Sequence, residues 1–256
     1  MEQATGSPDG PPVDFPPMNS IDVLAIAAHR DDVELTCGGA LLVAAARGRR
    51  TAIIDLTQGE MGTRGSTELR AREASLAAGV LGVAARENLG LPDAGIMNTP
   101  DTRAALAVVI RRFRPRVVIA PALKGRHPDH RVTAELVRDA CFVAGLSRLV
   151  PEVPAWRPFK VIHSLSFRED FDKPTFVVDV SAVFEKKLEA IACYGSQFEG
   201  ATQAGEIYPT GSPLIERVRQ QAAHYGSLIR CAYGEPYYTS ETMRVEDVST
   251  LDVSTF

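Results

Sequence analysis

The chain has 256 residues, of which 45% are hydrophobic, 23% charged and 7% aromatic, so it is long enough for one sizeable domain with a buried core. The formal net charge of −4, without a basic cluster interleaved with aromatic residues, argues against a nucleic-acid partner. No apolar run approaches the roughly 20 residues that span a bilayer, so no membrane partner is expected. A small molecule is the expected partner.

Both ends of the chain differ in amino-acid composition from its middle. Residues 1–20 contain two glycines and five prolines and lack the basic and apolar regions of a signal peptide. We therefore expect a disordered extension over residues 1–20, a single domain over residues 21–245 and a tail over residues 246–256. The four cysteines lie far apart without a CxxC pair, which indicates a reduced, cytoplasmic protein.

Before residue 150, apolar runs alternate with amphipathic stretches, the pattern of a parallel α/β sheet. The pattern predicts strands at 21–28, 51–56, 87–91 and 116–120, and helices at 38–49, 68–81, 102–113 and 130–144. Further on, it predicts strands at 159–166 and 175–180 and helices at 181–194 and 214–225. The predicted fold is a Rossmann-like, mostly parallel sheet flanked by helices in one domain.

Two polar clusters follow apolar runs of this pattern. His29-Arg30-Asp31-Asp32 follows Ile21–Ala28, and His127-Pro128-Asp129-His130 follows Val117–Ala120. Each cluster is expected just past the carboxyl end of a strand, where open α/β sheets place their ligand sites.

The side chains of His29, Asp32 and His130 are candidate metal ligands. Two imidazoles and a carboxylate with one open position are typical of a catalytic zinc, although iron(II) or cobalt would accept the same set. Such an ion lowers the pKa of bound water and so generates a nucleophile at neutral pH. Taken singly, the same residues could be loop residues or helix caps. Together, the two clusters predict a metal-dependent hydrolase with one zinc per chain.

Four neighbouring residues are candidates for the remaining chemistry. Asp31 suits a general base, and His127 could stabilise an oxyanion as a charged donor or protonate a leaving amine. His127 could instead orient a metal ligand. Arg70 and Arg126 could bind a substrate carboxylate, or they could be ordinary surface arginines.

A nucleotide-binding interpretation is disfavoured. Gly38-Gly39 follows the first predicted strand, but the G-x-G-x-x-G spacing is absent, as are a P-loop and a G-x-S-x-G motif. The two glycines are better explained by close packing of a helix on the sheet.

The two clusters resemble the signatures of the PIG-L/LmbE-like zinc deacetylases, AHPDDxExxxGG and HPDH. Here they read Ala28-His29-Arg30-Asp31-Asp32-Val33-Glu34 with Gly38-Gly39, and His127–His130. The resemblance covers about residues 21–245 and is strongest to the deacetylases that act on N-acetylglucosaminyl malate in bacillithiol biosynthesis. Four segments carry that finer likeness: Asp55–Ala74, Asn88–Asp93, Lys187–Phe198 and Tyr233–Tyr238.

The resemblance implies His29, Asp32 and His130 as zinc ligands, Asp31 as the general base and His127 as the oxyanion-stabilising or acid histidine. It also implies Arg70 and Arg126 in the substrate pocket, a Rossmann-like fold without a dinucleotide, and a homo-oligomer, commonly a trimer or hexamer.

One residue departs from the family pattern, since Arg30 stands where the family has proline. The change removes a fixed φ and adds a cation beside the metal ligands, and we expect its side chain to point away from them. Three alternatives remain open. They are deacetylation of another acetylated amino-sugar, glycolipid or thiol conjugate, a non-catalytic binding module, and a cofactor-dependent oxidoreductase.

Overall fold

The computed structural model describes residues 20–165, 167, 173–199 and 213–253. Its centre is a seven-stranded sheet in the order β3-β2-β1-β4-β5-β7-β6. Five strands run parallel: β1 (Val23–Ala27), β2 (Thr51–Thr57), β3 (Ala85–Leu91), β4 (Val117–Ala120) and β5 (Lys160–Ser164). Strand β7 (Gly234–Tyr238) is antiparallel to both β5 and β6 (Phe176–Asp179). The predicted single-domain, mostly parallel α/β fold is confirmed.

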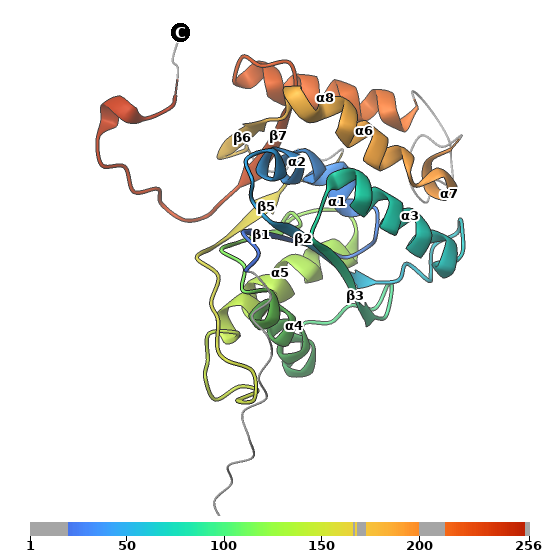
Figure 1. Ribbon diagram of the computed structural model, residues 1–256, viewed down its shortest axis with the longest axis vertical. Helices are drawn as coiled ribbons and strands as arrows, with labels where there is room; N and C mark the ends of the chain where they lie inside the picture. Colours follow the sequence, from blue (N-terminus) through green and yellow to red (C-terminus); the bar gives the residue numbers. More distant parts are fainter. Residues whose placement is uncertain (1–19, 166, 168–172, 200–212, 254–256) are drawn as a thin grey trace, which may run out of the picture.

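Helices cover both faces of the sheet (Figure 1). Helices α4 (Pro100–Phe113) and α5 (Pro128–Val143) pack together on one face. The other face carries α1 (Asp32–Thr36), α2 (Gly38–Ala46) and α3 (Thr67–Leu81), with α6 (Phe184–Ala192), α7 (Gly195–Phe198) and α8 (Leu214–Leu228) beyond them. None of the helices in the described ranges is long and apolar enough to cross a membrane.

Side chains that alternate between the two faces of the sheet form a hydrophobic core on each face. Leu24 and Ile26 of β1 pack in the cluster that α4 and α5 complete, whereas Ala25 and Ala27 join the cluster beneath α2. Successive side chains of a strand point to opposite faces, so a strand buried on both faces reads as a continuous apolar run. This is why the sequence pattern located β1 and β2 well.

Three short elements were not predicted: α1, α7 and β7. Helix α1 has five residues and α7 four, too few to show a helical period. Strand β7 contains Gly234 and Pro236, both of which are unfavourable in strands. The predicted helix at 181–194 is divided into a 3-10 turn, Ser181–Val183, and α6.

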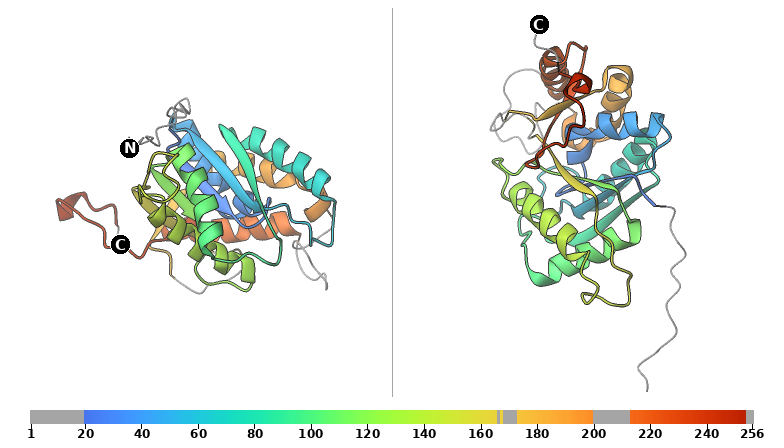
Figure 2. Two further views of the ribbon diagram at one scale, coloured as in Figure 1. Left: turned by 90° about the horizontal axis from the view of Figure 1, so that it is seen from below. Right: turned by 90° about the vertical axis from the view of Figure 1, so that its left-hand side faces the viewer.

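The predicted extension lies outside the described residues apart from Ser20. Beyond Glu241, which pairs with Arg138 of α5, the chain runs away from the body of the molecule (Figure 2), and the predicted tail from residue 246 is exposed as far as it is described. The domain boundaries themselves stay a prediction.

A buried ion pair explains the second glycine of the Gly38-Gly39 sequence. The Glu235 carboxylate accepts hydrogen bonds from the backbone N–H groups of Gly39 and Ala40, both at 2.7 Å. It also pairs with Lys187 Nζ at 2.6 Å. A Cβ atom at Gly39 would lie 2.6 Å from Glu235 Oε1. A carboxylate from β7 therefore occupies the start of α2, the position that a phosphate takes in nucleotide-binding folds.

Removing one member of this pair should be strongly destabilising. Glu235→Gln leaves the Lys187 ammonium, 3% exposed, without a counter-charge, and we expect a loss of about 3–5 kcal/mol in the free energy of unfolding. Glu235→Gln combined with Lys187→Met should recover part of this loss, because no unpaired charge remains. Denaturant unfolding of the two single variants and the double variant measures the effect, and additive losses would show that the pair is not coupled.

Candidate metal centre

The three predicted metal ligands lie together at the carboxyl ends of β1 and β4. Asp32 Oδ2 is 3.3 Å from His29 Nδ1 and 3.1 Å from His130 Nε2, and the two nitrogens are 3.3 Å apart. His29 follows β1, Asp32 begins α1 and His130 lies in the first turn of α5. Two nitrogens and one oxygen thus point to a common centre, the donor set that zinc accepts.

The second nitrogen of the His29 ring contacts two carboxylates. His29 Nε2 lies 3.1 Å from Asp93 Oδ1 and 3.4 Å from Asp129 Oδ2. These acceptors place the ring proton on Nε2 and leave the lone pair of Nδ1 facing Asp32 and His130. A carboxylate behind a ligating histidine orients the ring and raises its basicity in metal sites generally.

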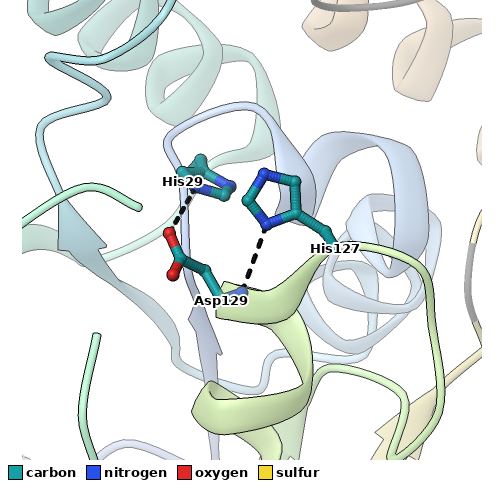
Figure 3. Close-up of side chains that lie close together, drawn as sticks. All are labelled: His29, His127 and Asp129. Atoms are coloured by element: carbon teal, nitrogen blue, oxygen red, sulfur yellow. Dashed lines mark hydrogen bonds and ion pairs between the residues drawn. The ribbon is translucent and has the colours of Figure 1, made fainter. Parts of the chain in front are cut away.

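A second group of three could also surround an ion: His29, His127 and Asp129. Figure 3 shows these side chains, with Asp129 reaching His29 and its own N–H directed at His127. The Asp129 carboxylate already accepts the Ala94 N–H at 2.8 Å, and His127 Nδ1 accepts the Asp129 N–H at 3.3 Å. In this second group the contacts therefore orient rings and cap a helix.

Charge is concentrated around the ligands. Burial alone would lower the pKa of His29, but the carboxylates of Asp32, Asp129 and Asp93 outweigh it and raise that pKa well above its usual value. The pKa of His130 is also raised, because Asp32 outweighs burial. Burial would raise the pKa of Asp32, yet the two imidazoles lower it well below its usual range. The carboxylates and imidazoles of this cluster therefore stabilise each other's charged forms.

Asp31 makes a different set of contacts from its neighbour. It makes no side-chain cap to α1 but lies 3.2 Å from Arg70 Nη2 and lines the same cavity as the ligands. Burial raises the pKa of Asp31, and Arg70 opposes the shift. A buried carboxylate held by one cation beside a metal site can accept a proton near neutral pH.

His127 caps α5 through Nδ1, which accepts the Asp129 N–H. That bond leaves Nε2 as the protonated nitrogen of a neutral ring. Partial burial and the neighbouring His29 and His130 lower the pKa of His127. The ring is therefore suited to donate a neutral N–H, in contrast to the charged donor that the sequence suggested.

The two predicted substrate arginines lie in different surroundings. Arg70 is 5% exposed and bonds Asp31 and the Gly59 carbonyl, so its charge is already paired. Arg126 is exposed and lines the cavity beside His127. Arg30 points away from the ligands, as expected, and donates to the carbonyls of Thr67 and Gln58.

A buried charge network behind the metal ligands was not predicted. Arg86 of β3 pairs with Glu34 at 2.6 Å and with Asp55 at 2.8 Å, and it donates to the Arg30 carbonyl. Tyr194 donates to the same carbonyl. Asp93 and Asp129 were also missed as ring-orienting residues, although both lie within segments that carried the resemblance.

Comparison with known proteins gives a consistent picture. Residues 24–141 match the PIG-L family, described as GlcNAc-PI de-N-acetylase. The diacetylchitobiose deacetylase of Thermococcus kodakarensis is 30% identical over 232 residues, which cover 86% of this chain and 83% of the relative. The 4-oxalmesaconate hydratase of Pseudomonas putida is 26% identical over 196 residues, covering 68% and 73%.

A solved structure extends the likeness to the fold. A conserved protein from Thermus thermophilus superposes with a TM-score of 0.79 and 36% sequence identity, covering 88% of this chain and 98% of that one. The range 24–141 that matches the family contains both the HRDD and the HPDH cluster. The chain belongs to the PIG-L family.

Proposed function

We propose that this protein is a zinc-dependent hydrolase that removes the acetyl group from an N-acetylglucosamine conjugate. The convergence of His29, Asp32 and His130 beside Asp31, in one cavity of about 610 Å³, carries the proposal. Family membership and the deacetylase relative support it.

The donor set fits a divalent metal. Two neutral imidazoles and one carboxylate would leave an ion with one formal positive charge, and zinc is the ion that this set suits best. When bound, zinc supplies a Lewis acid that polarises a carbonyl and acidifies water. The carboxylates behind His29 would keep its Nδ1 available for that ion.

The remaining groups have distinct tasks in amide hydrolysis. The Asp31 carboxylate, held by Arg70, accepts the proton that an attacking water loses. The Nε2–H of His127 donates a hydrogen bond to the developing oxyanion. The C–N bond then breaks, and the proton passes to the nitrogen, so that water and the amide become acetate and a free amine.

The cavity has room for more than the sugar. Pockets of about 300–1,000 Å³ hold ligands of drug size, and this one combines the apolar side chains of Leu165, Phe167 and Leu214 with Arg126 and Gln197. Arg126 is exposed and lines the cavity, so it is the arginine that we assign to an anionic aglycone. N-acetylglucosaminyl malate, the bacillithiol precursor, is the proposed substrate; another amino-sugar, a glycolipid or a thiol conjugate is the alternative.

The cysteine pattern extends the proposal to a cytoplasmic location, and the resemblance extends it to a trimer or hexamer. Large exposed apolar side chains, including Phe142 and Phe159, are compatible with burial between copies of the chain. Light scattering of the purified protein would measure the assembly.

Amine release should depend on the metal and on the aglycone. We expect zinc-loaded protein to deacetylate N-acetylglucosaminyl malate faster than diacetylchitobiose or free N-acetylglucosamine, and chelator-treated protein to be inactive. Fluorogenic amine detection measures every combination of substrate and metal state. Equal rates on the three substrates would retain the deacetylase and reject the malate assignment. No amine release, with hydration of an unsaturated acid instead, would indicate the chemistry of the hydratase relative.

Asp31→Asn should lower kcat by roughly 10²- to 10⁴-fold, the usual contribution of a positioned general base. Bound zinc should stay at one per chain, because Asp31 is outside the proposed ligand set. Steady-state kinetics and metal analysis measure both quantities, with Asp252→Asn in the exposed tail as the control. Loss of zinc together with activity would contradict the base assignment.

Zinc affinity should fall as the pH is lowered. Metal binding requires neutral imidazoles, and the pKa values of His29 and His130 are raised, so protons compete with the ion below those pKa values. We expect the dissociation constant to rise roughly 10- to 100-fold per pH unit, for one or two protons displaced. Chelator competition between about pH 8 and about pH 6 measures the dependence.

Two variants decide which group of three holds the ion. His130→Gln should abolish tight zinc binding, whereas His127→Gln should leave both the affinity and its pH dependence nearly unchanged. The reverse result would move the metal to His29, His127 and Asp129.

A further inference from the structure

The loop between β2 and α3, residues 58–66, forms one wall of the cavity. Its residues Met61, Gly62 and Thr63 line the space in which a substrate would lie. These residues are exposed, so contacts made at other points of the loop must hold this wall.

Arg30 joins the two ends of this loop. Its Nη1 donates to the Thr67 carbonyl at 2.6 Å and to the Gln58 carbonyl at 3.4 Å. The side chain is 8% exposed, although its neighbours His29 and Asp31 both face the cavity. One guanidinium thus closes the base of the loop from the segment that carries the metal ligands.

Other contacts tie the same loop to groups of the site. Arg70 donates to the Gly59 carbonyl at 3.0 Å, and Asp93 accepts the Met61 N–H at 2.9 Å. Gly59 has a φ of +73°, and a Cβ atom there would lie 2.1 Å from Arg70 Nη1. Because Arg70 also holds Asp31 and Asp93 also holds His29, the position of the wall and the geometry of the site depend on each other.

We propose that Arg30 is a positioning residue that holds this wall against the substrate and thereby determines substrate affinity. A proline at this position would have no side-chain donor, so both loop carbonyls would need other partners. An arginine presents several N–H donors in a fixed plane and can serve two carbonyls at once. The kinetic part of the proposal rests on the proposed deacetylase function, whereas the structural part does not.

Hydrogen exchange of the zinc-loaded protein tests the structural part without any substrate. In Arg30→Met, the amides of residues 59–66 should exchange roughly tenfold faster or more, since a charged hydrogen bond is lost at each end of the loop. Arg30→Lys should give an intermediate effect, because an ammonium lacks the planar fork.

Arg111→Met is the matched control. Arg111 is a buried arginine that donates to five carbonyls between Ala144 and Val153. Its loss should speed exchange in that segment and leave residues 59–66 unchanged.

Kinetics on N-acetylglucosaminyl malate test the affinity part. Arg30→Met should raise KM roughly tenfold while kcat stays within about threefold and zinc stays at one per chain. Unchanged exchange in residues 59–66 would overturn the proposal whatever the activity. Faster exchange with an unchanged KM, or a fall in kcat with loss of zinc, would overturn the affinity role. If wild-type protein releases no amine, the proposed function fails and exchange alone decides whether Arg30 holds the wall.

Discussion

The metal-ligand segment depends on one buried guanidinium, that of Arg86. It reaches Glu34 on α1, Asp55 on β2 and the backbone carbonyl of Arg30 between the ligands. A buried cation is tolerated only where its charge and hydrogen bonds are matched, so these partners have little freedom to move. Burial raises the pKa of Glu34 to about 7 despite Arg86, because two buried carboxylates share one cation. The contacts of Arg86 with Glu34 and with the Arg30 carbonyl therefore fix the backbone path of residues 29–34.

Much of the fold could be predicted because buried apolar residues recur along the sequence in patterns typical of strands and helices. The central strands β1, β2 and β4 read as apolar runs, and the long helices have good formers and clear ends, such as Gly82 with a φ of +67° after α3. Strand β7 could not be found this way, because its place between β5 and β6 depends on pairing with residues far away in the chain. A strand with a glycine and a proline carries too weak a local signal.

In the site, too, residues in local motifs could be predicted and residues that act through long-range contacts could not. His29, Asp32 and His130 stand in short motifs after strands, and the structure brings them together as the spacing predicted. Asp93 and Arg86 act through contacts between elements distant in sequence, so no local pattern reveals them. The direction of Arg70 depends on how α3 lies over the loop, which no local pattern reveals. Its guanidinium pairs with Asp31 at the wall of the cavity, and its role toward the substrate stays a prediction.

Acidic side chains surround the two histidines of the candidate metal centre. The carboxylates of Asp32, Asp93 and Asp129 each lie within 3.4 Å of a His29 nitrogen, and Asp31 pairs with Arg70. Such an excess of buried negative charge needs compensation, and the carboxylates accordingly raise the pKa of His29 and of His130. A divalent ion held by His29, Asp32 and His130, as proposed above, would bring positive charge to the same carboxylates, so that protons and metal would compete for one set of groups.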